Sequence, residues 1–382
     1  MTSMSSSLIA PVEANFILKH LTHGDVRNIG LPIAAVMLFY PVFSIIFCCY
    51  CGMAKKILGW SFLLSAAAIS AAVLSGNLIL YSLVKVPWAL TVALGGPVML
   101  TFLQHQFHDK ANFEHLFGYL NAGTALTGAL FAFLGGMMGQ KSLLSPYTLL
   151  VALFGLIGVM VLAGGNKIHE EDHKPAEGIL RSARELRQST PLGFFVFYFV
   201  TYPIMFVNIS LRPMIWPQFL AGFPKSQLLV GSLFSGMGLA ALAGSFCYGA
   251  ITKKFGLNRV MVTAMLCFWG CTAGIVYSNN TVPLLYLYAV GIAVSESMLM
   301  PSRMSVIRGH VPKRLLSAFG GFETVVSSIV SMLVMLSFGQ VQSRIGIAGT
   351  FRLILWLNAA TIAVFLMLRG NLASCERRDI KP

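Results

Sequence analysis

A short glycine–lysine motif occurs twice in this chain, once in each half, and each copy separates two long apolar segments. Residues Gly52 to Gly59 read G-M-A-K-K-I-L-G, and residues Gly249 to Gly256 read G-A-I-T-K-K-F-G. Both fit the pattern G-x-x-x-K-x-x-G. Duplicated helical units are typical of secondary transporters, in which the solute site lies where the two repeats meet.

Apolar segments occupy most of the sequence. A helix needs about 20 apolar residues to cross a bilayer. By this measure eleven membrane spans are expected, near residues 29–51, 58–84, 87–104, 117–139, 143–164, 191–211, 227–250, 259–278, 283–305, 315–339 and 344–368. Hydrophobic residues make up 56% of the chain and charged residues 10%, a composition that suits lipid and excludes an ordinary soluble domain. Since each span must satisfy its own backbone polar groups, we expect an all-α polytopic membrane protein with two pseudo-symmetric helical bundles.

The longest polar stretch divides these spans into two groups. We expect an N-terminal segment (1–27), a bundle of five spans (28–165), a linker (166–190), a bundle of six spans (191–369) and a tail (370–382). The apolar run 7–18 is too short to cross a bilayer, so the first bundle is expected to lack its first helix. Either the start is assigned too far downstream, which we favour, or the protein is a reduced variant.

Positive charge gives the expected orientation. The net charge is +14, and alternate connections carry most of the 27 Lys and Arg residues. The positive-inside rule makes those connections, the linker and the C-terminus cytoplasmic, with the N-terminus outside. The opposite connections carry few cations, among them Lys85 and Arg212. We therefore expect a multi-pass protein of a bacterial inner membrane, with the lipid bilayer as its surroundings and no nucleic-acid partner.

The repeated motif resembles the signature of the major facilitator superfamily, which reads roughly G-x-x-x-D-[RK]-x-G-[RK]-[RK]. The second copy keeps Gly249, Lys254, Gly256 and Arg259 of that pattern. The resemblance implies transport by alternating access, with one central site shared by two bundles. It also implies that these turns act in gating on the cytoplasmic side.

The first copy keeps Gly52 and Gly59, and both copies carry a lysine, Lys56 or Lys253, where the family most often has an acid. The usual charge relay of this turn is therefore altered. We expect Gly52 and Gly249 each to end a helix in close contact with a neighbour, a position that excludes bulky side chains.

Two acidic residues, Glu296 and Glu323, lie well inside the expected spans. An ionisable group at that depth is a functional-site candidate, because it costs several kcal/mol unless it is paired, wetted or neutral. We expect one of them to bind the coupling proton; a structural glutamate is the alternative. Arg303 lies on the same helix face as Glu296 and is expected to reach the cytoplasmic headgroups.

Other polar candidates for solute contact are Asn121, which corresponds to Glu323 in the repeat, and three residues of the expected span 191–211, Tyr198, Tyr202 and Asn208. Ordinary interface aromatics explain the tyrosines equally well.

The sets His105, His108 and Asp109 and His169 to His173 have metal-compatible spacing, but they lie on cytoplasmic connections where solvated histidines are expected, and the cysteines lack further ligands. No P-loop is present, so no metal, no other cofactor and no ATP-driven step are expected.

The leading hypothesis is a monomeric, proton-coupled secondary transporter of a small organic solute, without enzymatic activity. Efflux of a drug-like or siderophore-like amphiphile is favoured over uptake because the spans are rich in methionine. Sodium stays open as the coupling ion. The alternatives are a solute importer and a non-transporting membrane sensor or assembly subunit.

Overall fold

The computed structural model describes residues 2–49, 54–106, 110–164, 185, 202–278, 281–311 and 316–373. Within these ranges the chain forms helices and turns and contains no strand. It divides into two compact units. Unit 1 comprises Met1–Ala176, Leu211–Ser235 and Ser331–Arg344, and unit 2 comprises Glu177–Ser210, Gly236–Val330 and Ile345–Pro382.

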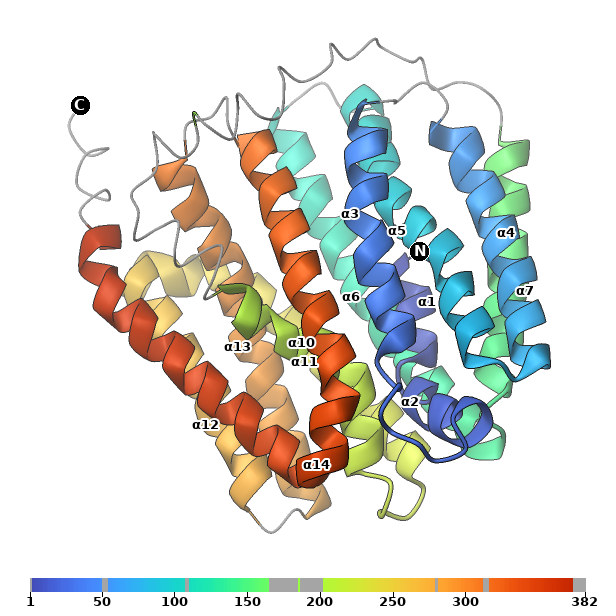
Figure 1. Cartoon of the computed structure of the whole chain (residues 1–382). Coiled ribbons are helices and arrows are strands. Elements are labelled where there is room, and N and C mark those ends of the chain that lie inside the picture. The colour runs from blue at the N-terminus through green and yellow to red at the C-terminus, as the bar shows by residue number, and fades with distance from the viewer. Residues whose placement is uncertain are drawn as a thin grey trace. The chain divides into compact units, whose positions relative to one another are not determined.

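Unit 1 is built mainly from the helices of the first half of the chain (Figure 1). In chain order these are α1 (Thr2–Ile9), α2 (Glu13–Phe16), the π-helix η1 (Ile17–Leu21), α3 (Leu31–Cys49), α4 (Ala54–Ser75), α5 (Leu78–Gln106), α6 (Lys110–Lys141) and α7 (Ser145–Ala163). Helix α4 packs against α5 and α7, and α3 packs against α5. Helix α1 contacts α5, α6 and α7, so the N-terminal residues are part of this bundle.

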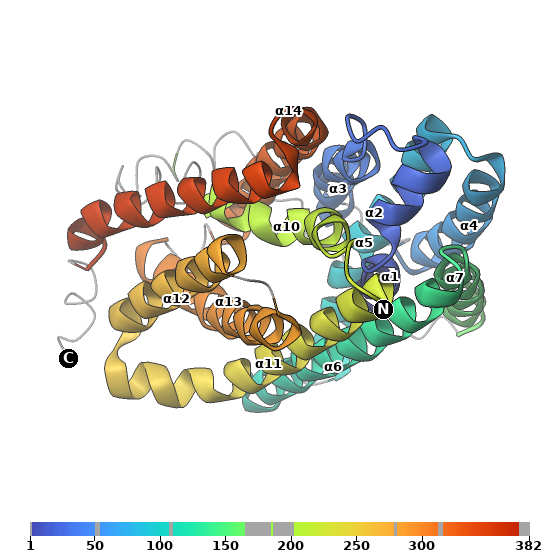
Figure 2. The same cartoon turned by 90° about the horizontal axis from the view of Figure 1, so that it is seen from below.

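The second half of the chain contributes α10 (Tyr202–Phe219), α11 (Ser226–Phe255), α12 (Leu257–Tyr277), α13 (Val282–His310) and α14 (Leu316–Ala373). In unit 2, α12 and α13 run side by side (Figure 2). Helix α14 is interrupted at Gly346, whose φ of 72° breaks the helical path and produces two consecutive segments. Glycine adopts this left-handed φ without the steric cost that a Cβ would add.

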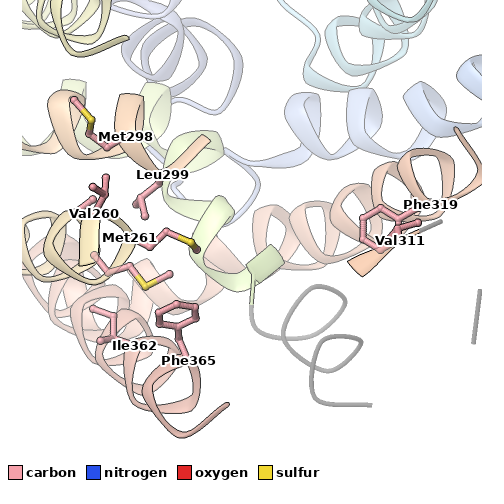
Figure 3. Packing of buried hydrophobic residues seen from close by; sticks show 10 residues of the cluster. Val260, Met261, Met298, Leu299, Val311, Phe319, Ile362 and Phe365 are labelled. Carbon is pink, nitrogen blue, oxygen red and sulfur yellow. The ribbon is translucent and has the colours of Figure 1, made fainter. Parts of the chain in front are cut away.

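Buried apolar side chains from three helices and from the residues between α13 and α14 form a core in unit 2 (Figure 3). Its members are Val260, Met261, Ala264, Met265, Met298, Leu299, Val311, Phe319, Ile362 and Phe365. The methionines at 261, 265 and 298 thus fill a helix–helix core, a role that suits their flexible side chains.

Six described segments are long and apolar enough to cross a membrane: Lys56–Ser75, Ser145–Ala163, Ser226–Phe255, Leu257–Tyr277, Val282–Ser302 and Glu323–Met367. Leu31–Ser44 and Leu78–Leu94 are shorter apolar helices. Large apolar side chains such as Leu74 and Met367 are more than three-quarters exposed, as helices facing lipid tails require. The expected all-α polytopic architecture is confirmed.

Two expected boundaries are wrong. The expected spans 58–84 and 87–104 meet at Lys85, whereas the helices meet at Gly76 and Asn77, and Lys85 lies inside α5. The expected span 191–211 ends before Arg212, whereas α10 continues to Phe219 and holds Arg212 half-buried. In both cases a cation one or two residues before a proline resembles a connection in sequence, but proline is tolerated within membrane helices whose neighbours satisfy the freed backbone.

Glycines bring helices of unit 1 into close contact. A Cβ on Gly136 of α6 would lie 2.6 Å from the Gln227 carbonyl oxygen and 2.7 Å from Gly231 Cα, both on α11. A Cβ on the adjacent Gly135 would overlap the Leu8 carbonyl of α1. Small residues permit such backbone contacts in lipid, where packing holds helices together in place of the hydrophobic effect.

Candidate functional site

An ion pair is buried inside unit 1. The Lys85 Nζ of α5 lies 2.5 Å from the Glu13 Oε1 of α2 and donates a hydrogen bond to it. Glu13 is 5% exposed and Lys85 is 4% exposed. Removing two charges from water costs several kcal/mol each, so a buried pair requires close geometry and further hydrogen bonds. Ionisable groups held among apolar helices are functional-site candidates.

A break in the N-terminal helix positions Glu13. Helix α1 ends at Ile9, Pro11 follows, and α2 begins at Glu13. Proline has no backbone N–H and its ring excludes the preceding helical turn, so the first helix cannot continue unchanged through this point. The π-helix Ile17–Leu21 comes directly after α2. Discontinuous helices and π-helical turns occur frequently at functional sites of membrane proteins.

The start of α5 positions Lys85. Gly76 has a φ of +62°, and the Asn77 side-chain oxygen accepts hydrogen bonds from the backbone N–H groups of Ile79 and Leu80. This cap begins α5 at Leu78 and places Tyr81 and Lys85 four residues apart, on one face of the helix. Lys85 lies about 10 Å along the helix from this end.

Tyrosine hydroxyls complete the polar cluster. The Tyr81 hydroxyl donates a hydrogen bond of 3.1 Å to Glu13 Oε1, and it lies 3.0 Å from the Tyr147 hydroxyl of α7. Both tyrosines are buried. The carboxylate oxygen therefore accepts from one ammonium and one hydroxyl group, which offsets part of the cost of burying its charge.

Aromatic rings surround the charged groups. The Lys85 Nζ lies 4.0 Å from the centre of the Trp88 ring and 5.1 Å from that of the Tyr81 ring. The Phe16 and Tyr147 rings are 4.5 Å apart between their centres. The ring faces attract the ammonium group, so Lys85 has favourable partners in addition to Glu13.

Neither Glu13 nor Lys85 was expected to lie at this site. Glu296 and Glu323 were the acids expected inside the membrane spans; the structure adds Glu13, which is buried although it lies outside those spans. The signal in the sequence is an isolated acid between Leu8-Ile9 and Phe16-Ile17-Leu18. The apolar run around it is too short to span a bilayer, and a length criterion takes no account of burial by tertiary contacts.

The two expected proton-binding residues belong to unit 2. Glu323 of α14 is 7% exposed, and Glu296 of α13 is half-buried. Glu296 lies between Ser295 and Ser297, both buried. Their roles stay predictions.

Other expected solute contacts lie partly outside the described residues. Tyr198 lies outside them altogether. Asn121 lies on α6, Tyr202 and Asn208 lie on α10, and Arg303 lies on α13, but the side chains of these four are outside the described set. In the ranges described, no group of three or more His, Cys, Asp or Glu side chains is arranged to hold a metal ion.

The repeated motif adopts different structures in its two copies. Gly256 alone forms the turn between α11 and α12, with a φ of +83°, and exposed Lys253 precedes it in the last turn of α11. Lysine at a helix C-terminus stabilises the helix dipole. In the first copy, exposed Lys56 and buried Gly59 lie within α4, not in a turn.

The close contact expected at Gly249 is wrong. Gly249 lies exposed within α11, and a Cβ there would have no neighbour within 4 Å. Gly59, in contrast, faces α7, where an added Cβ would lie 2.7 Å from a Leu162 methyl carbon. Gly52 lies outside the described residues, and exposed Arg259 follows the turn on α12. The gating role of the motif stays a prediction.

No protein-family model matches the sequence, and a search of curated proteins found no match. Among solved structures, a mutant of the nucleoside transporter NupG is similar over 96% of this chain and 100% of its own, with 12% identity and a TM-score of 0.72. A D-xylose-proton symporter is similar over 96% of this chain and 94% of its own, with 11% identity and a TM-score of 0.71. A second structure of NupG gives 15% identity and a TM-score of 0.69.

These identities are low, so the likeness concerns the fold, and it extends over nearly the whole chain. The polytopic helical architecture is consistent with this similarity in fold. This chain therefore shares the helical fold of these solved transporters, in agreement with the fold that the resemblance of its repeated motif implies.

Proposed function

We propose that this protein is a proton-coupled secondary transporter of a small organic solute, working by alternating access. The observation that carries the proposal is the Glu13–Lys85 pair, buried in a helical bundle of a transporter fold. Similarity in fold to a nucleoside transporter and a D-xylose-proton symporter supports a polar solute such as a nucleoside or sugar. It also supports uptake over the efflux favoured by composition alone.

Glu13 is the proton-binding residue in this proposal. Protonation neutralises the carboxylate and leaves Lys85 without its counter-charge. An uncompensated charge is costly inside the protein, so protonation changes the relative free energies of the conformations that the helices can adopt. Proton binding at Glu13 is in this way coupled to the conformational change that moves the solute.

Reconstituted flux tests this proposal. Proteoliposomes with an inward proton gradient are offered radiolabelled nucleosides and pentoses, while an internal pH dye reports proton entry. Wild type is expected to accumulate one of these solutes together with protons. Glu13→Gln is expected to lose gradient-driven accumulation but to retain solute exchange, because an amide mimics the protonated carboxyl group and cannot release a proton.

Glu296→Gln and Glu323→Gln are the comparison variants. Gradient-driven accumulation that persists in Glu13→Gln and disappears in Glu296→Gln would move the proton site to unit 2. A non-transporting sensor or assembly subunit is the second candidate function. It is the conclusion if wild type gives no flux of any of these solutes, in either direction, with or without the gradient.

A further inference from the structure

We infer that the hydroxyl groups of Tyr147 and Tyr81 form a proton relay that connects Glu13 with the aqueous end of the bundle. This inference deepens the proposed function and rests on its claim that Glu13 binds the coupling proton. The three oxygens belong to α7, α5 and α2, so the relay exists only in the folded bundle.

The hydrogen bonds give the relay one direction. A tyrosine hydroxyl has a single proton to donate. Tyr81 donates its proton to Glu13 Oε1 over 3.1 Å, so in the 3.0 Å contact between the two hydroxyls Tyr147 is the donor. Both hydroxyl protons therefore point toward the carboxylate.

Both tyrosines are buried, but each lies close in sequence to an exposed turn at the start of its helix. Tyr147 lies in the first turn of α7, directly after the turn 142–144, where Leu144 is 38% exposed. Tyr81 lies in the first turn of α5, after the exposed turn at Gly76 and Asn77. Both turns lie at the same end of unit 1 (Figure 1). The charge pattern assigns this end to the outer side of the membrane.

The transfer balances without any other reactant. A proton from water binds the Tyr147 oxygen, Tyr147 passes its own hydroxyl proton to Tyr81, and Tyr81 passes its proton to Glu13 Oε1. One proton enters and one arrives, both hydroxyls are restored, and no electron moves. As the carboxylate becomes neutral, the Lys85 ammonium keeps the Trp88 ring at 4.0 Å as a partner.

The charged and titratable groups near Glu13 are few among the described residues. Helix α5 contributes Tyr81 and Lys85, and α7 contributes Tyr147. The His20 ring of η1 lies tilted against the Phe16 ring, with ring centres 5.3 Å apart. Helix α6 ends with exposed Lys141, and α10 holds half-buried Arg212. Of these groups, Lys85 and Tyr81 donate hydrogen bonds to the Glu13 carboxylate, and Tyr147 lies within hydrogen-bond distance of Tyr81.

The experiment measures proton arrival at Glu13 and does not require a transported solute. Full-length protein in proteoliposomes is subjected to an external acid jump, and the carboxyl stretching band of Glu13, assigned by its loss in Glu13→Gln, is followed by time-resolved infrared spectroscopy. Tyr147→Phe is expected to slow the rise of this band by on the order of tenfold or more. Its final amplitude should match that of wild type, because Tyr81 still donates to Glu13.

Two further variants separate a relay from structural support. Tyr81→Phe removes the hydroxyl that donates to Glu13, and it is expected to slow the rise of the Glu13 band at least as much as Tyr147→Phe does. Tyr277→Phe, at an exposed position of α12, is the matched control and should keep the wild-type rate. Phenylalanine preserves the ring contacts in each case, so folding should be retained.

Unchanged rates in both Tyr147→Phe and Tyr81→Phe would overturn the relay. Absence of any pH-dependent Glu13 band would also overturn it, whatever flux is observed. A slowed band in a protein that transports none of the offered solutes would instead support the relay and count against the proposed function alone.

Discussion

At the scale of single residues, the main feature of this protein is that Glu13 and Lys85 neutralise one another in a place where neither is stable alone. Glu13 accepts hydrogen bonds from Lys85 and Tyr81, and Lys85 lies against the Trp88 ring. Burial makes the stability of the protein sensitive to the loss of one partner, because no water is available to solvate the charge that remains.

A double-mutant cycle measures this dependence. Lys85→Met is expected to lower the free energy of unfolding by about 3–5 kcal/mol, since it leaves the Glu13 carboxylate buried without its cation. Adding Glu13→Gln should recover much of that loss, because a neutral amide removes the uncompensated charge. Thermal unfolding in detergent of the two single variants and the double variant gives the coupling. Strictly additive effects would show that the two groups do not interact.

At the scale of helices, packing in unit 1 depends on positions where backbones meet. Gly136 of α6 lies against Gly231 of α11, and Gly135 lies against the Leu8 carbonyl of α1. Other glycines of the same helices, including Gly123 and Gly249, have no neighbour within 4 Å of an added Cβ. The presence of a glycine therefore does not by itself identify a close helix contact. The contact depends on whether another helix faces that glycine in the folded chain.

Two glycine substitutions on α6 test this distinction. Gly136→Ala would place a methyl group 2.6 Å from the Gln227 carbonyl oxygen, so we expect a loss of about 1–3 kcal/mol in unfolding free energy. Gly123→Ala meets open space and is expected to be neutral or stabilising by up to about 1 kcal/mol, because alanine favours the helix. Thermal melts of both variants decide the question. Equal melting temperatures of the two variants would mean that α6 and α11 can move apart to accept a methyl group without loss of unfolding free energy.

At the scale of the whole molecule, the helical architecture, the apolar surfaces and the similarity in fold to transporters agree with one another. The orientation in the membrane is a prediction from charge. The large excess of Lys and Arg on alternate connections indicates that the linker is cytoplasmic and that the turns 76–77 and 142–144 face outward.

Reporter fusions check this orientation. Alkaline phosphatase folds to an active enzyme only outside the cytoplasm, so a fusion after Asn279 is expected to be active and a fusion after His173 inactive. Expression of both fusions is compared by immunoblot as the control. The opposite pattern would reverse the topology and place the outer end of the tyrosine relay on the cytoplasmic side.

The sequence alone determined the class of the protein. Long apolar segments must form helices in lipid, because no other local structure satisfies the backbone there. The resemblance of the duplicated motif correctly implied the fold that this chain shares with the solved transporters.

The tertiary structure decided where the charges lie. Lys85 resembles a loop residue in sequence, and Glu13 lies in an apolar run too short to span a bilayer. Each is tolerable inside the bundle because the other is 2.5 Å away, and they come from helices separated by η1, α3 and α4 in the chain. Hydropathy scores each residue by itself, whereas the cost of a buried charge depends on its partner, and only the folded chain supplies that partner.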